Sequence, residues 1–220
     1  MKVKKANLYK FEPVLSYDRS IMKRNIKNLF SGRTAVFIDA ANLERSLADL
    51  GTKPPNLKRI PKGFVWKPFP KGYWSVDYKK LRKFFAETSR LVSISFYSAK
   101  FGTKSHENFL AFLKFNGYRL VTKKIKEIKT GNGDHRKANF DVEIAVDAVS
   151  WIRNFDTFVL FSGDSDFTHL LHHLSKKKKR TVVISQRGHV ANELVKAADY
   201  YLDIFGLRGE ILRPKTQKSR

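Results

Sequence analysis

Carboxylates follow two apolar segments that have the composition of buried β-strands. Asp39 comes directly after residues 34–38 (Thr-Ala-Val-Phe-Ile), and Asp164 and Asp166 follow residues 158–161 (Phe-Val-Leu-Phe). Uninterrupted apolar strands are typical of parallel sheets that are covered on both faces. Parallel strands end at one edge of their sheet, where open α/β sheets bind ligands. We therefore expect these carboxylates to gather at a single rim.

A further carboxylate lies on a helix predicted for residues 139–152. At about 100° per residue, Asp141 shares an arc of this helix with Ile144 and Ala148, so we expect its carboxylate to be partly buried. If that face packs near the rim, several carboxylates crowd together, and protonation or a divalent cation must relieve their repulsion. Because the candidate ligands are oxygens and the chain has no Cys, the pattern favours Mg²⁺ or Mn²⁺.

Helix capping is the alternative explanation for each acid taken alone. Asp39 and Asp164 lie where helix N-caps are expected, and Asp is among the strongest N-caps. Capping does not explain why acids from three separate segments would converge. The spacing therefore favours a metal site and leaves capping open at each position.

The rest of the sequence alternates between predicted strands and helices. We predict strands at 34–38, 91–97, 118–124, 157–162, 181–185 and 201–205. Helices are predicted after the first strand up to about residue 50, and at 77–88, 106–116, 139–152, 167–175 and 190–198. Strands that are regularly separated by helices indicate a three-layer α/β/α fold with a mostly parallel central sheet.

The chain is strongly basic. Its 44 Lys and Arg against 20 Asp and Glu give a formal net charge of +24, with an isoelectric point near 10.2. Such a charge favours polyanionic partners, chiefly nucleic acid and secondarily an anionic membrane surface. RNA is the expected partner, and formation of a homodimer is a further possibility that the sequence leaves open.

The composition divides the chain into a basic extension (1–32), one α/β domain (33–205) with a proline-rich insertion (51–75), and a basic tail (206–220). Met1 is not followed by an apolar run, so no secretory signal is predicted. No stretch approaches about 18 uncharged apolar residues, so we predict a soluble, cytoplasmic protein with no membrane partner. Cys is absent, which excludes disulfides and Cys-type zinc sites.

Five segments resemble, in sequence and in order, the NYN family of PIN-like nucleases. They fall within residues 33–205 and lie at 36–43, 76–81, 137–147, 159–167 and 194–199. The most specific feature is Ser-Gly-Asp-Ser-Asp-Phe at 162–167 together with the upstream pair Asp39 and Asn42. The resemblance implies a PIN-like, Rossmann-like α/β fold and metal-dependent hydrolysis of phosphodiester bonds, usually in RNA.

The resemblance also implies roles for individual residues. The family's metal-binding acids correspond to Asp39, Asp141 and Asp164, with Asp166 beside them. Asn42 corresponds to a polar residue that orients the first acid or a substrate phosphate. Asp147 corresponds to a recurrent acid, which we include among the candidate metal ligands. One departure is the stretch Ala138-Asn139-Phe140, where the family has a glycine before its third acid; this change could shift Asp141 slightly.

A cation at this rim would polarise the scissile phosphate and lower the pKa of a bound water, while Asp164 or Asp166 accepts the proton. Two other functions fit the same residues. A non-catalytic RNA-binding module would use the acids as caps and ion-pair partners. A Mg²⁺-dependent phosphatase or nucleotide-binding protein also uses acids that follow a strand. The net charge of +24 favours a polymer over a small substrate.

Basic and aromatic residues alternate in the proline-rich insertion, which suits stacking and phosphate contacts with single-stranded RNA. The candidates there are Lys67, Lys71, Trp66 and Trp74. Anchoring of a long loop by its aromatics is an equally good interpretation. A polar, glycine-rich loop predicted at 130–137 adds Arg136 and Lys137 as candidate phosphate contacts. The basic run at 176–180 ends a predicted helix, so solvated, dipole-compensating cations are its first interpretation and phosphate contact its second.

Overall fold

Six parallel strands form the central sheet of the computed structural model, which describes residues 26, 28–53, 67–124, 126–130, 133–137 and 139–215. They are β1 (Arg33–Asp39), β3 (Arg90–Lys100), β4 (Arg119–Lys124), β7 (Thr157–Phe161), β8 (Arg180–Ser185) and β9 (Tyr200–Asp203). Neighbours in the order β4-β3-β1-β7-β8-β9 all pair in parallel. The chain fills one side of β1 first and then crosses to β7 on the other side. The carboxyl ends of β1 and β7 therefore flank the switch point where such sheets bind ligands.

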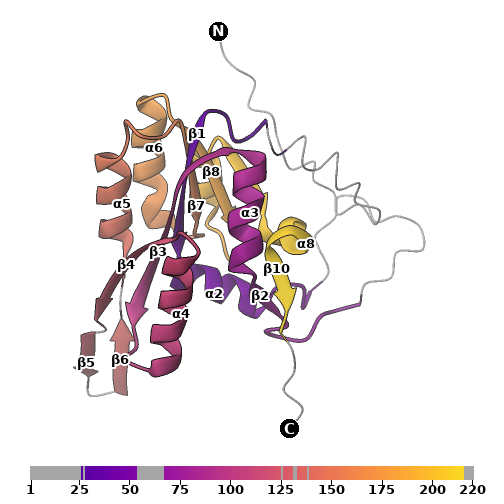
Figure 1. Cartoon of the computed structure of the whole chain (residues 1–220), viewed down its shortest axis with the longest axis vertical. Coiled ribbons are helices and arrows are strands. Elements are labelled where there is room, and N and C mark those ends of the chain that lie inside the picture. The colour runs from indigo at the N-terminus through magenta and orange to yellow at the C-terminus, as the bar shows by residue number, and fades with distance from the viewer. Residues whose placement is uncertain are drawn as a thin grey trace.

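Helices cover both faces of this sheet, as the sequence predicts. One face carries α2 (Ala40–Ala48), α3 (Tyr78–Thr88), α4 (Lys104–Phe115) and α8 (Arg208–Ile211). The other carries α5 (Asp141–Ser150), α6 (Thr168–Lys176) and α7 (Asn192–Ala197). Figure 1 shows α5 and α6 on one side of the strands and α3 and α8 on the other. The predicted three-layer α/β/α fold is confirmed.

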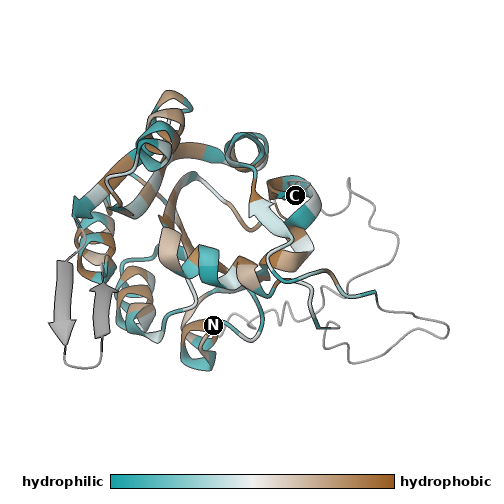
Figure 2. Cartoon of the chain, turned by 90° about the horizontal axis from the view of Figure 1, so that it is seen from below, coloured by the Kyte–Doolittle hydropathy of each residue, from teal (hydrophilic) through white to brown (hydrophobic). Residues whose placement is uncertain are grey.

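Strand β1 shows why the sheet is buried on both faces. Val36 and Ile38 belong to the core under α2 and α3, whereas Ala35 and Phe37 belong to the core under α5 and α6. Side chains alternate between the faces of a strand, so a strand covered on both sides must be apolar at every position. The helices instead carry both apolar and polar residues, which Figure 2 shows as brown and teal on the same ribbons.

The predicted basic tail at 206–220 is wrong for residues 206–215, which fold into the domain. A 3-10 helix (Ile204–Leu207) and α8 lead into β10 (Leu212–Pro214), which pairs antiparallel with β2 (Trp74–Val76). Ile211 and Leu212 are buried in the core under α3. The three buried aliphatic residues of this basic stretch, Leu207, Ile211 and Leu212, are too few to produce a recognisable period. Residues 216–220 lie outside the described part.

The folded domain also begins earlier than the predicted boundary between the extension at 1–32 and the domain. Ile26, Leu29 and Phe30 are buried in the core beside α3. The backbone carbonyl of Ser31 accepts a hydrogen bond from Thr157 Oγ1 (2.6 Å), which ties this segment to β7. The domain therefore already includes residue 26, while residues 1–25 lie outside the described part of the chain.

The glycine-rich loop predicted at 130–137 is part of a hairpin. Strands β5 (Lys126–Thr130) and β6 (Gly133–Lys137) pair antiparallel in a separate two-stranded sheet. The sequence has no apolar alternation there, so period-2 patterning could not reveal these strands. The side chains of both strands, including Arg136 and Lys137, lie outside what the structure describes.

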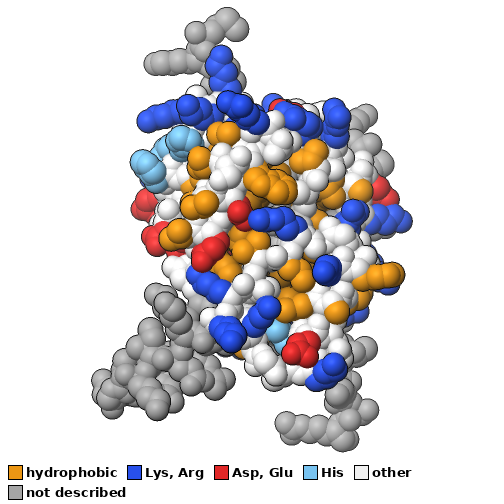
Figure 3. Space-filling view, turned by 60° about the vertical axis from the view of Figure 1, so that its left-hand side comes forward, with side chains coloured by type: hydrophobic (Ala, Val, Ile, Leu, Met, Phe, Trp, Pro, Cys, Tyr) orange, Lys and Arg blue, Asp and Glu red, His pale blue; other side chains and the backbone are white. Residues whose placement is uncertain are grey.

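Basic side chains are unevenly distributed on the surface. On the face drawn in Figure 3, Lys and Arg side chains form a row across the top, and acidic side chains lie below them. The top of this view is the end of the molecule where β1 begins in Figure 1. Within the described residues, no helix is both long enough and apolar enough to cross a membrane.

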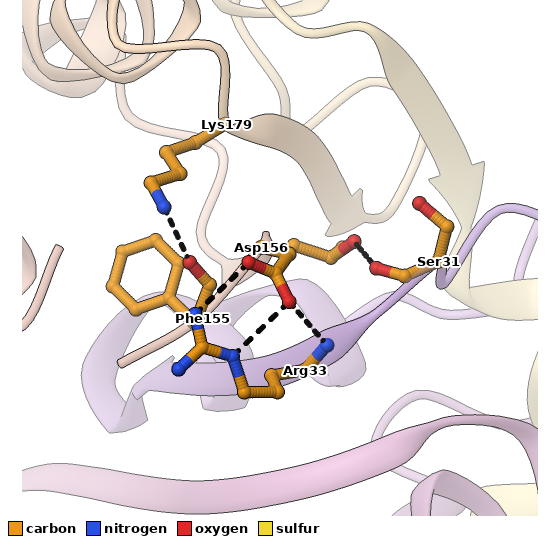
Figure 4. A network of polar contacts seen from close by, with 6 residues as sticks. Ser31, Arg33, Phe155, Asp156 and Lys179 are labelled. Atoms are coloured by element: carbon orange, nitrogen blue, oxygen red, sulfur yellow. Dashed lines mark hydrogen bonds and ion pairs between the residues drawn. The ribbon is translucent and has the colours of Figure 1, made fainter. Parts of the chain in front are cut away.

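Asp156 connects the start of β1 to the turn before β7 (Figure 4). Its carboxylate accepts hydrogen bonds from the backbone N–H of Arg33 (2.8 Å) and from the Arg33 guanidinium (3.1 and 3.2 Å). The side-chain hydrogen bond from Arg33, followed by the backbone one, lowers the pKa of Asp156 from its ordinary value to about 2.

We expect Asp156→Asn to destabilise the fold by about 1 kcal/mol at neutral pH, a value reduced from the full linkage energy because this side chain is partly exposed. Because the folded-state pKa is depressed, the carboxylate's contribution is complete above its unfolded pKa. That contribution disappears as the pH falls towards about 2. Urea denaturation of both proteins at several pH values measures it. A difference in stability that stays constant between about pH 7 and pH 2 would contradict this account.

Candidate metal centre

Asp39 ends β1 and caps α2. Its Oδ1 accepts the backbone N–H of Asn42 (3.2 Å), and its Oδ2 accepts the hydroxyl of Ser162 (3.4 Å). The capping predicted as an alternative is therefore present. It does not compete with a role in the site, because a carboxylate has about four lone-pair positions and these contacts leave others open.

Asn42 connects the carboxyl ends of β1 and β7. Its side-chain carbonyl accepts the backbone N–H of Gly163 at 2.8 Å, and Asn42 itself is buried. The Gly163 carbonyl in turn accepts the N–H of Ala191 (2.9 Å) from the segment after β8. Asn42 therefore fixes the backbone from which Asp164 projects. This positioning role differs from direct contact with a phosphate.

The segment after β7 turns Asp164 and Asp166 towards the same side. Asp164 caps a short 3-10 helix (Ser165–Phe167), and its Oδ1 accepts the N–H of Asp166 at 3.0 Å. The N–H of Asp164 donates to Ser162 Oγ at 3.3 Å. Ser162 therefore touches both Asp39 and Asp164, which brings the ends of the two neighbouring strands together.

Asp141 begins helix α5, and the preceding Asn139 holds it there. The N–H of Asp141 donates to Asn139 Oδ1 (3.0 Å), and Asn139 Nδ2 donates back to the Asp141 carboxylate. Asn139, which lies in the stretch where the family has a glycine, thus forms a local turn at the start of the helix. The shift that this departure suggested does not separate Asp141 from the other acids.

The carboxylates of Asp141, Asp164 and Asp166 form one group. Each offers an oxygen, and these oxygens all lie within 4.8 Å of one another. Octahedral Mg²⁺ ligands at about 2.1 Å lie about 3 to 4.2 Å apart, so small side-chain movements would let one cation contact all three carboxylates. The oxygen-only donor set also suits Mg²⁺ or Mn²⁺. The residues present therefore fit such an ion.

Asp39 lies beside this group without belonging to it. Burial raises the pKa of Asp39 above its ordinary value, and the negative charge of Asp141 raises it further. The hydrogen bonds from Asn42 and Ser162 act in the opposite direction. The effect of Asp141 shows that the two carboxylates are close enough to repel, so an ion held by the group would also stabilise ionised Asp39.

We expect Asp39→Asn to be more stable than the wild type in EDTA at neutral pH. A folded-state pKa that is raised above the unfolded value makes the protonated acid the favoured form of the fold. The contribution of Asp39 is therefore complete below its unfolded pKa and is lost as the pH rises through the folded one. Asparagine avoids this loss while keeping an oxygen for the cap.

Thermal denaturation of metal-free protein measures the difference, which should vanish below about pH 4, where Asp39 is protonated in both states. An Asp39→Asn protein that unfolds at a lower temperature than the wild type at neutral pH would show that Asp39 stabilises the fold by its charge.

Asp147, a candidate metal ligand by resemblance, is not brought into the group. It accepts hydrogen bonds from Arg119 Nη1 (2.7 Å) on β4 and from Tyr97 Oη (2.8 Å) on β3. One turn earlier on α5, Glu143 pairs with Lys123 Nζ (2.7 Å), also on β4. These two pairs hold α5 against the β3–β4 edge and so set the position of Asp141. Arg119, Lys123 and Tyr97 are positioning residues that sequence reasoning missed, because only long-range packing reveals them.

The candidate substrate contacts of the insertion divide into two kinds. Trp74 packs partly buried against the core, with ring centroids 5.2 Å from Phe69 and 5.0 Å from Tyr73, so it anchors this segment. Lys71 Nζ lies 3.5 Å from Asp49 Oδ1, and Lys67 is exposed to solvent. Trp66 lies outside the described residues.

Comparisons with known proteins found similar sequences and a similar fold. Residues 33–205 match the family model of the NYN domain. The chain is 32% identical over 146 residues to "Low amplitude and bright protein LabA" of Synechococcus elongatus, which covers 64% of this chain and 78% of LabA. The crystal structure of a Vibrio parahaemolyticus protein of unknown function superimposes with a TM-score of 0.60 and 19% identity, covering 79% of this chain and 93% of that one. The last similarity concerns the fold alone.

Proposed function

The chain belongs to the NYN domain family, and on that premise we propose that it is a metal-dependent ribonuclease that hydrolyses phosphodiester bonds of RNA. One observation carries the proposal. Three carboxylates from two separate segments approach one another beyond the carboxyl ends of β1 and β7. The net charge of +24 supports a polyanionic substrate over a small one.

The four acids at the rim would have two different roles. Asp141, Asp164 and Asp166 would hold Mg²⁺ or Mn²⁺. When bound, such an ion supplies a Lewis acid for a phosphate oxygen and neutralises charge that develops there. Asp39 lies outside the three-carboxylate group and has the raised pKa of a proton acceptor. In place of Asp164 or Asp166, which would hold the ion, we assign Asp39 the proton of the attacking water. The water oxygen bonds to phosphorus as the bond between phosphorus and the leaving oxygen breaks, and the leaving oxygen takes a proton from solvent.

Incubation with labelled single-stranded RNA tests the proposal. The wild type should cleave the RNA in Mn²⁺ or Mg²⁺ and leave it intact in EDTA. Tight binding without cleavage in either metal would contradict the proposal and support a non-catalytic RNA-binding module. Release of phosphate from nucleotides, with the RNA left intact, would support a phosphatase instead.

A further inference from the structure

Cations mark the edge of the sheet that lies opposite the carboxylates. Four of the six central strands begin with an arginine, namely Arg33, Arg90, Arg119 and Arg180. The turn before β7 adds Arg153, the last residue of α6 adds Lys176, and the turn before β8 adds Lys177 and Lys178. Because parallel strands all start at one edge, these residues share it. Figure 3 shows a row of Lys and Arg side chains at this end of the molecule.

Two of these arginines are neutralised and the others are not. Arg33 pairs with Asp156, and Arg119 pairs with Asp147. Arg180 donates instead to the backbone carbonyls of Asn28 and Leu29, which carry no net charge to offset its own. Among the described residues, no ion pair involves the remaining cations of this edge. We call these cations the amino-edge band: Arg90, Arg153, Lys176, Lys177, Lys178 and Arg180.

The strand register sets the length of this band. Arg33 lies opposite Arg90, and Arg180 lies opposite Thr157 on β7. From β3 through β1 and β7 to β8 there are three strand spacings of about 4.8 Å, so the band extends over about 14 Å. A row of cations with this spacing suits several successive phosphates of one strand better than a single small anion.

Lys178 has a left-handed backbone conformation, which favours glycine over lysine. It has φ of 60° and is the one non-glycine residue with positive φ in the described part of the chain. Its N–H bonds to Ser175 O (2.9 Å) and the N–H of Lys179 bonds to Leu174 O (2.9 Å), the Schellman pattern that ends α6. Glycine is the favoured residue at that position because a Cβ strains the left-handed conformation. The chain therefore keeps a lysine, and its charge, at a position that glycine would favour.

We propose that the amino-edge band binds RNA phosphates outside the cleavage site. Without a cation the carboxylates at the rim repel a phosphate backbone, so basic residues elsewhere on the surface are needed to supply affinity for RNA. The seven residues of β1 separate the two edges by about 20 Å. One RNA strand can therefore contact the band with one segment while another reaches the rim. RNA as the polyanion rests on the proposed function.

Binding of uncleaved, labelled single-stranded RNA in EDTA tests this surface. The triple variant Lys176→Gln, Lys177→Gln and Lys178→Gln is compared with Lys79→Gln, Lys80→Gln and Lys83→Gln on α3, which removes the same charge elsewhere. Each lost phosphate contact should reduce the slope of log K against log salt by about 0.7, so the band variant should lose about 2. The α3 variant should keep the wild-type slope.

Lys178→Gly alone provides a test that misfolding cannot imitate. It should raise the unfolding temperature, because glycine fits the left-handed position, and yet weaken RNA binding. Equal slopes for the two triple variants would overturn the proposal, as would anionic vesicles of phosphatidylserine competing for the band more strongly than RNA. If the wild type cleaves RNA and the band variants bind RNA as tightly as the wild type, only the proposed binding surface is refuted. Band-dependent binding without cleavage in any metal would instead refute the nuclease proposal.

Discussion

Replacing Asp164 by Asn should lower metal-dependent cleavage of RNA by about a hundredfold or more, because it removes a charged ligand from the centre of the site. Asparagine keeps an oxygen that can still accept the N–H of Asp166, so the local turn should survive. The loss should also appear without RNA. Mn²⁺ at about a hundred times its dissociation constant should stabilise the wild type by about 2.7 kcal/mol and the variant much less.

Asp203→Asn is a matched control for this change. Asp203 ends β9 at the same edge of the sheet, and its Oδ1 accepts the N–H of Phe205 at 3.0 Å, as Asp164 does with Asp166. It is not among the three grouped carboxylates. Asp164→Asn should therefore lose cleavage and the metal-dependent thermal shift, whereas Asp203→Asn should keep both. Equal losses in the two proteins would mean that the overall negative charge of the rim matters and a specific ligand does not.

Gly163→Ala should destabilise the fold by roughly 2–4 kcal/mol and abolish cleavage. A Cβ at this position would lie 2.0 Å from the backbone oxygen of His189 and 2.9 Å from Ser185 Oγ. A backbone oxygen cannot yield as a flexible side chain can, so the segment that carries Asp164 must move. Urea denaturation and the RNA assay measure the two effects.

Gly209→Ala controls for the loss of a glycine as such. Gly209 lies in α8, and a Cβ there would meet nothing within 4 Å. Alanine in a helix is favoured over glycine, so this variant should be as stable as the wild type or more stable. If both variants behaved alike, the close approach at Gly163 would not explain the choice of glycine.

The rim was predictable because it depends on direction and not on detailed packing. The apolar runs before Asp39 and before the 162–166 segment identify buried strands, and parallel strands must end together. The need for glycine at position 163 could not be predicted from the sequence. Its φ is not in the left-handed region, and the close contact with the backbone oxygen of His189 is what requires glycine.

The parts that the sequence could not reveal depend on long-range contacts. We predicted Asp147 as a candidate metal ligand, but it is bound by Arg119 and Tyr97, and these partners are visible only once β3 and β4 are in place. Likewise, Leu212 pairs with Val76, 136 positions away in the sequence, and no local period could indicate that contact.

Anomalous scattering from crystals soaked in Mn²⁺ examines most directly whether this chain holds a catalytic cation. We expect one strong peak among the carboxylates of Asp141, Asp164 and Asp166 in the wild type, and none there in Asp164→Asn. Density for manganese at other positions only, or none at a saturating concentration, would contradict the assignment of the metal centre and with it the proposed nuclease.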